Sequence, residues 1–210
     1  MRTIRVVDGE YTIENEIKHS RFIATVKGEV GQEEADAFVK NVKKRYSDAT
    51  HNCYAYVADE LGNVARFSDD GEPGGTAGQP ILDVIRKQGL VKTAVVVTRY
   101  FGGIKLGAGG LVGAYSSAAS DVLKVAKILV KKECKKVTIS CDYQSFPSIE
   151  KYLFKADCKP LPFLFEDSVN GEVFVPTFDV EKFVADLKEL TSGKAHVVVD
   201  NEITFEATKG

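Results

Sequence analysis

Several features that would indicate a metal site, a membrane protein or a secreted protein are missing from this sequence. None of the four cysteines forms a C-x-x-C pair, and neither they nor the three histidines show zinc-ligand spacing. No apolar run approaches the length that spans a bilayer, and residues 1–16 lack the basic-then-apolar layout of a signal peptide. These absences predict a cytoplasmic protein with reduced thiols and no membrane partner.

The chain also has little excess charge of either sign. Its net charge is −2, too close to neutral for composition to indicate a nucleic-acid binder. Residues 1–132 carry 19 Lys or Arg and 16 Asp or Glu, whereas residues 133–210 carry 9 and 14. An anionic partner is therefore expected to meet the first part of the chain. The apolar share of 44% allows a real core.

Residues 1–132 show strand and helix patterns that predict one domain. The run 93–100 (TAVVVTRY) is the most continuously apolar one, which is typical of a strand buried on both faces of a sheet. Small residues in the last helix permit close packing, so the helices are expected mostly on one face of the sheet. The expected strands are 11–19, 22–30, 53–59, 64–68 and 93–100, and the expected helices are 32–46, 79–88 and 111–127.

Residues 133–210 follow the order βαββαβ, which is the ferredoxin-like plan. A charged connector is expected at 131–136 and a turn at 170–171. The chain is thus predicted to be an α+β protein of two domains, 1–132 and 133–210. The expected elements are strands 137–143, 159–166, 172–176 and 195–205, and helices 146–156 and 180–190.

A first candidate site lies in the irregular segment 69–78 (DDGEPGGTAG). Clustered carboxylates can hold a hard cation such as Mg²⁺, and turn geometry alone does not need four glycines. The alternative is a solvated turn in which Asp and Gly only supply backbone geometry. The candidate residues are Asp69, Asp70, Glu72, Gly74, Gly75 and Thr76.

A second candidate site lies where the apolar strand ends and a glycine-rich turn leads into a helix. Backbone N–H groups at a helix start suit an anion, glycine lets a ligand approach, and Lys105 can pair with a phosphate or carboxylate. Neither a dinucleotide fingerprint nor a P-loop fits this glycine spacing. A plain packing turn is the alternative. The candidates are Arg99, Tyr100, Phe101, Gly102, Gly103, Lys105, Gly107, Gly109 and Gly110.

Three more polar residues are candidates for binding: His19 and Arg21 at the first strand turn, and His51 before the strand at 53–59. A lone histidine is more often an ordinary surface residue than a catalyst, and no nucleophile–base arrangement can be argued from spacing. Cys53 is expected to be a small buried apolar residue. No catalytic residue is assigned. We expect the two glycine-containing turns to face one cleft.

Four segments closely resemble the IMPACT family, in its bacterial YigZ-like branch: KHSRFIA (18–24), ATHNCYAY (49–56), DDGEPGGTAGQPIL (69–82) and VVVTRYFGGIKLGAGGLVGAYSSA (95–118). The resemblance covers about the first 130 residues. It implies the βαβ fold of a small-subunit ribosomal protein's second domain, followed by a tail resembling domains of elongation factor G. Eukaryotic relatives regulate translation through an additional N-terminal domain that this sequence does not contain, so kinase control is not implied.

Three functions are weighed. The first, favoured mainly by the resemblance, is a translation-linked regulator, to which no catalytic activity is assigned, that binds RNA, a ribosomal particle or a translation-associated protein through the Gly-rich cleft. No cofactor and no DNA preference are inferred. The second is a Mg²⁺-dependent enzyme on a small phosphorylated or anionic substrate. The third is a protein-interaction module anchored by Tyr100, Phe101 and Ile104.

Overall fold

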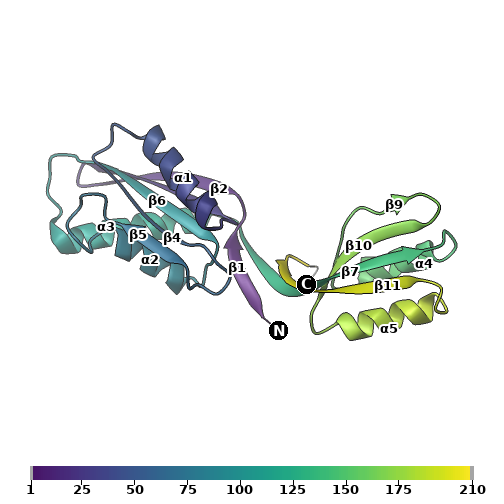
Figure 1. Ribbon diagram of the computed structural model, residues 1–210. Helices are drawn as coiled ribbons and strands as arrows, with labels where there is room; N and C mark the ends of the chain where they lie inside the picture. The colour runs from purple at the N-terminus through teal and green to yellow at the C-terminus, as the bar shows by residue number, and fades with distance from the viewer. Residues whose placement is uncertain (1, 209–210) are drawn as a thin grey trace. The chain divides into compact units, whose positions relative to one another are not determined.

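The computed structural model describes residues 2–208 of the 210-residue chain. It divides into two compact units (Figure 1). The first unit is Ile4–Leu129, and the second consists of the residues from Val130 onward with Arg2 and Thr3. The α+β, two-domain class predicted from the sequence is confirmed. Among the described residues, no helix is long and apolar enough to cross a membrane.

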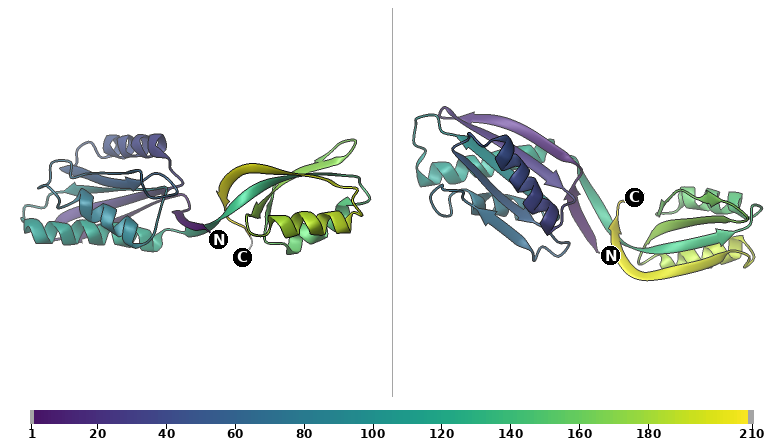
Figure 2. Two further views of the ribbon diagram at one scale, coloured as in Figure 1. Left: turned by 60° about the horizontal axis from the view of Figure 1, so that its bottom comes forward. Right: turned by 45° about the horizontal axis from the view of Figure 1, so that its top comes forward.

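The first unit is built on an antiparallel sheet with the strand order β2-β3-β6-β4-β5. Two helices, α2 and α3, cover one face, and α1 covers the other (Figure 2). The sheet strands are β2 (Glu10–Ile17), β3 (Ser20–Gly28), β4 (His51–Val57), β5 (Ala65–Ser68) and β6 (Thr93–Tyr100). The helices are α1 (Gln32–Arg45), α2 (Gly78–Lys87) and α3 (Gly107–Val125).

The central strand β6 is continuously apolar from Ala94 to Val97 because both of its faces are covered. Val95 and Val97 pack into the core beneath α2 and α3, whereas Ala94 and Val96 pack into the core beneath α1. Side chains of a strand alternate between faces, so two cores need an unbroken apolar run. Its carboxyl end therefore emerges from a rigid, fully packed element, which fixes the position of Arg99 and the turn that follows.

The second unit follows the predicted βαββαβ order with its second strand split in two, and β11, β7, β10 and β8 lie side by side in its sheet. Helices α4 and α5 pack on the sheet through Ile149, Leu153, Phe183 and Leu187. The bounds are β7 (Ile128–Cys141), α4 (Phe146–Lys155), β8 (Lys159–Pro160), β9 (Leu164–Phe165), β10 (Val169–Pro176), α5 (Val180–Leu190) and β11 (His196–Glu206).

Several sequence-based expectations about these elements differ from the structure. Strand β1 (Thr3–Val7), which pairs with β7, was not predicted. The charged connector 131–136 is part of β7, where Lys132 and Lys136 pair with Asp157 and Glu172. The single strand expected at 159–166 is two short strands, β8 and β9. The glycine-rich turn ends earlier than expected, because α3 already begins at Gly107.

The turn expected at 170–171 is also wrong, since both residues lie inside β10. Glycine is needed at position 171 for packing, not for turning. A Cβ built on Gly171 would lie 2.4 Å from Cδ1 of Phe163, so the aromatic ring occupies the space of a side chain. Glycine inside a strand often marks such a close approach.

Candidate functional site

Asp69 organises the acidic turn from within. Its carboxylate accepts hydrogen bonds from the backbone N–H groups of Gly75 (2.8 Å), Ala77 (3.0 Å) and Gly78 (2.8 Å). Burial alone would raise the pKa of Asp69, but these three donors outweigh it and lower the pKa below its ordinary value. Ala77 and Gly78 are the first residues at the start of α2. Asp69 therefore caps this helix and closes the loop, with both of its carboxylate oxygens accepting hydrogen bonds.

Asp70 ties the same turn to α1 and β4. Its carboxylate accepts hydrogen bonds from Lys43 Nζ and, at 2.7 Å, from the backbone N–H of Asn52. Burial opposes ionisation, but these two donors lower the pKa of Asp70. Its carbonyl oxygen lies 2.8 Å from Nδ1 of His51, which must carry the proton because a carbonyl only accepts. Asp70 and His51 thus fix each other within the loop.

Glu72 and Arg99 form a buried ion pair that joins the acidic turn to the end of β6. Arg99 Nη1 donates to Glu72 Oε1 at 2.7 Å, and the two side chains are only 6% and 4% exposed. The hydroxyl of Tyr115, from the middle of α3, donates to the same oxygen at 2.8 Å. Burial raises the pKa of Tyr115, so its hydroxyl keeps its proton and remains a donor. On its other side, His51 Nε2 lies 3.9 Å from Glu72 Oε2.

The guanidinium of Arg99 is held between two aromatic rings but is not fully satisfied. Its Cζ lies 5.5 Å from the ring centroid of Phe22 and 5.4 Å from that of Phe101, and Nη2 donates to Ser20 Oγ at 3.3 Å. Its Nε is buried and has no hydrogen-bond partner among the described residues. Buried donors are almost always paired, so an unused donor at this position is unusual.

Both turns line one cleft of about 330 Å³, which we call the Arg99 cleft. The acidic turn contributes Glu72 and Pro73, and the remaining wall comes from the end of β6, its turn and the start of α3. The lining residues are Glu72, Pro73, Arg99, Phe101, Lys105, Leu106, Gly107, Ala108 and Leu111. The side-by-side placement of the two turns, expected from the sequence, is found in the structure.

The glycines of these turns serve two different purposes. Gly102 is required by the fold, since a Cβ there would lie 1.9 Å from the carbonyl oxygen of His19. Gly109 is different: its φ is not in the left-handed region, and a Cβ would meet nothing within 4 Å. Glycine inside a helix costs up to about 1 kcal/mol relative to alanine. The fold therefore gives no reason for Gly109, which leaves the surface at the start of α3 open.

The first turn of α3 is exposed and carries no side-chain cap. Leu106 occupies the N-cap position and makes no capping hydrogen bond, and residues 107–110 are exposed. The first N–H groups of a helix have no partner within it, so they point outward at this end. Lys105, also exposed, precedes them directly. This end of the cleft is electropositive.

The other predicted residues lie around the cleft without lining it. Arg21 pairs with Glu14 at 2.8 Å and packs over the Tyr100 ring, whose hydroxyl donates to Asp48. The side chain of His19 is 72% exposed, at the β2–β3 turn. Thr76 donates to Pro73 O within the acidic turn, to which Gly74 and Gly75 also belong. Gly103 takes positive φ in the turn before α3, as does Gly107, which is itself one of the lining residues, and Gly110 packs against Leu106.

Sequence reasoning missed the residues that hold the site from behind: Ser20, Lys43, Asn52 and Tyr115. Tyr115 carries the one available signal, because a phenol in the apolar stripe of a buried helix needs a hydrogen-bond partner. Cys53 is buried as expected, and burial raises the pKa of its thiol to about 12, so it stays protonated.

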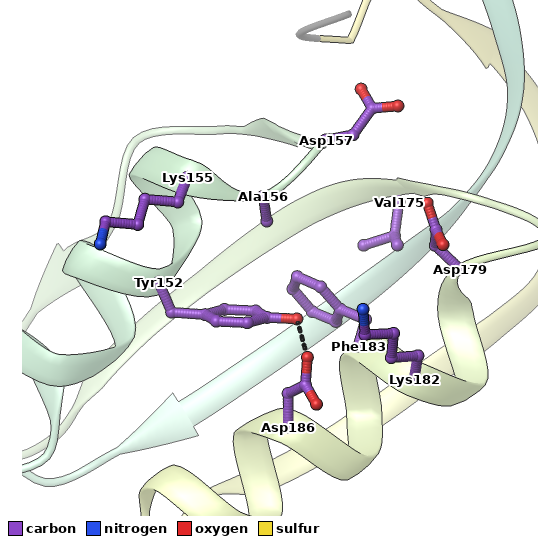
Figure 3. A pocket seen from close by; sticks show the side chains of 9 residues that line it. All are labelled: Tyr152, Lys155, Ala156, Asp157, Val175, Asp179, Lys182, Phe183 and Asp186. Carbon is purple, nitrogen blue, oxygen red and sulfur yellow. Dashed lines mark hydrogen bonds between the residues drawn. The ribbon is translucent and has the colours of Figure 1, made fainter.

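A larger cavity, of about 410 Å³, lies between α4 and α5 of the second unit (Figure 3). The Tyr152 hydroxyl points across it and donates to Asp186 Oδ2 at 2.8 Å. Lys155 and Lys182 line it together with Asp157, Asp179 and Asp186, so its charges are mixed. It is therefore not electropositive in the way that the α3 end of the Arg99 cleft is.

A family model described as the Impact N-terminal domain matches residues 18–123, which include every predicted site residue. The chain is 38% identical over 189 residues to IMPACT family member YvyE of Bacillus subtilis, covering 90% of this chain and 87% of that protein. The chain belongs to the IMPACT family. It is also 36% identical to YigZ of Escherichia coli, over 91% of this chain and 95% of that one.

Two further matches extend the family comparison. A crystal structure described as that of a hypothetical protein superposes with a TM-score of 0.63 at 34% identity, covering 96% of this chain and all of that one. The IMPACT homolog of Dictyostelium discoideum is 42% identical over 66 residues, which is 30% of this chain and 19% of that protein. The likeness to the eukaryotic protein is thus confined to a part of each chain.

Proposed function

We propose that this protein is a translation-linked regulator that binds RNA, free or within a ribosomal particle, through the Arg99 cleft. The observation that carries the proposal is the open start of α3. A 19-residue helix presents its uncapped N-terminus to the cleft, next to Lys105. Helix N–H groups, a lysine and glycine backbone are the donors that recognise phosphate. Membership of a family linked to translation supports RNA as the source of that phosphate.

The magnesium-enzyme alternative has less support. Each of its three carboxylates is already engaged: Asp69 by backbone N–H groups, Asp70 by Lys43 and Asn52, and Glu72 by Arg99 and Tyr115. No group of three or more His, Cys, Asp or Glu side chains is placed to hold a metal within residues 2–208. A turnover screen with Mg²⁺ on small phosphorylated compounds, repeated with Asp70→Asn, tests this alternative directly.

The RNA proposal is tested by filter binding and ribosome co-sedimentation across a salt series. Each phosphate contact adds about 0.7–0.9 to the slope of log K against log salt. Lys105→Gln should therefore reduce the magnitude of that slope by the contribution of one phosphate contact, and it should weaken binding to every RNA sequence. Lys87→Gln is the matched control. Lys87 is also exposed, but it is the last residue of α2. The chain leads from there to the start of β6, whereas the Arg99 cleft lies at the end of that strand.

Binding that is insensitive to salt, or equal weakening by the two lysine substitutions, would count against a phosphate site in this cleft. Salt-insensitive retention of one ribosomal protein would move the partner from RNA to protein. In that case Tyr100, Phe101 and Ile104 would be the first residues to substitute, because Phe101 and Ile104 are exposed apolar groups beside the cleft.

A further inference from the structure

Building on the proposed function, we infer that the Arg99 cleft takes one unpaired nucleotide of single-stranded RNA. The base stacks on the ring of Phe101, and the adjacent phosphate sits at the N-terminus of α3. The inference goes beyond phosphate contact, because it assigns the cleft a ligand class that excludes duplex RNA.

Phe101 has the properties of a stacking platform. It is 46% exposed although it is a large apolar residue, and it lines the cleft. Its backbone N–H donates to Thr50 Oγ1 at 3.0 Å, which fixes the start of the turn. The Arg99 guanidinium lies 5.4 Å from the ring centroid and so supports the ring from the protein side. A single exposed apolar residue is ordinary, but one held in place beside anion donors is what base recognition uses.

The placement of a phosphate at the start of α3 rests on two independent observations. One is the open start of α3, a helix of 19 residues with no side-chain cap and with exposed glycines. The other is Arg99 Nε, a buried donor without a partner on a side chain that is only 6% exposed and lines the same cleft. An anion in the cleft would face the N–H groups of α3 and Lys105, and Nε is a donor of Arg99 that its ion pair with Glu72 does not use. The Glu72 carboxylate, which also lines the cleft, is already neutralised by Arg99.

The cleft fits an unpaired nucleotide and not a duplex. At about 330 Å³ it lies at the small end of ligand-pocket volumes, which run from about 300 to 1,000 Å³. Bases in an A-form helix are stacked on both faces, so none is available to Phe101. A single-stranded segment can turn one base out onto the ring while its backbone follows the electropositive edge.

The experiment uses the absence of tryptophan from the sequence. Phe101→Trp in the full-length chain introduces a single reporter at the proposed platform. Titration with a short single-stranded RNA should quench its fluorescence, whereas the same sequence annealed to its complement should not. Phe101→Ala and Phe101→Leu should each weaken single-strand binding by about 5- to 160-fold, the range for losing one base–aromatic stack.

Phe67→Ala is the matched control, because Phe67 is also 46% exposed but lies on β5 and does not line the cleft. Unchanged single-strand affinity in Phe101→Ala, or equal affinity for single strand and duplex, would overturn this inference. If Lys105→Gln still reduced the salt dependence of binding in that case, the proposed RNA binding would stand without the stacking of a base on Phe101. Absence of any RNA or ribosome binding by the unsubstituted protein would overturn both.

Discussion

Replacing Glu72 by alanine should destabilise the first unit more than most single substitutions do. The change leaves the Arg99 guanidinium buried without its 2.7 Å carboxylate partner and the Tyr115 hydroxyl without its 2.8 Å acceptor. Removing one member of a buried ion pair costs about 3–5 kcal/mol. Domains of this size are stable by about 5–15 kcal/mol, so the melting temperature should fall by roughly 10–20 °C.

A double-mutant cycle tests whether the loss comes from the stranded arginine. Urea unfolding should be followed by far-UV circular dichroism and by amide resonances of β6, which assign the transition to the first unit. Glu72→Leu with Arg99→Met removes both charges and should be far less costly than Glu72→Ala. Tyr115→Phe, which deletes one hydroxyl, should cost about 1 kcal/mol.

Two results would refute this account of the ion pair. One is a cost below about 1 kcal/mol for Glu72→Ala, which would mean that Arg99 finds water or another acceptor. The other is additivity, in which the double variant loses the sum of its two single losses, because interacting partners must show coupling.

Two further predictions concern the same unit. The pKa of Asp70 is lowered in the folded state, so its contribution to stability is complete above the unfolded value of about 3.9 and is lost as the pH falls below it. Asp70→Asn should therefore flatten the dependence of unfolding free energy on pH between about pH 5 and pH 3, measured by urea titration; an unchanged slope would contradict the Lys43 and Asn52 contacts. Gly109→Ala and Gly113→Ala should each raise stability by up to about 1 kcal/mol in thermal melts, since a Cβ meets nothing within 4 Å at either position. Only Gly109→Ala should weaken RNA binding, and equal binding by both variants would argue against phosphate at the start of α3.

The sequence predicts the helices and core strands well where one pattern of apolar residues dominates a segment. Strand β6 and helix α5 have the expected bounds, because a continuous apolar run and a clear amphipathic stripe leave little choice. The misses occur where tertiary contacts override local preference. Lys132 and Lys136 fit a strand because Asp157 and Glu172 neutralise them, and Gly171 fits one because Phe163 covers it. The ion-pair partners lie 25 or more residues away in the sequence, and Phe163 belongs to the irregular segment before β9.

The position of the candidate site can be predicted from the sequence, but its hydrogen bonds and ion pairs cannot. The two turns are expected together because each borders a strand–helix junction, and they line one cleft. The spacing of the acidic residues in the sequence does not show which partner each carboxylate contacts. Three acids within four positions suggest a cation site, yet Asp69, Asp70 and Glu72 face different partners from α2, α1 and β6. Local sequence gives the count of charges, whereas only the fold determines which charges are already paired.

The loop held by Asp69 also bears on how the cleft meets its ligand. Ordering a backbone residue costs about 1–2 kcal/mol in conformational entropy. In the acidic turn, three amides converge on one carboxylate, so that cost is met during folding and not at the moment of association. The wall that carries Glu72 and Pro73 is therefore preorganised, and a ligand entering the Arg99 cleft loses little affinity to loop ordering.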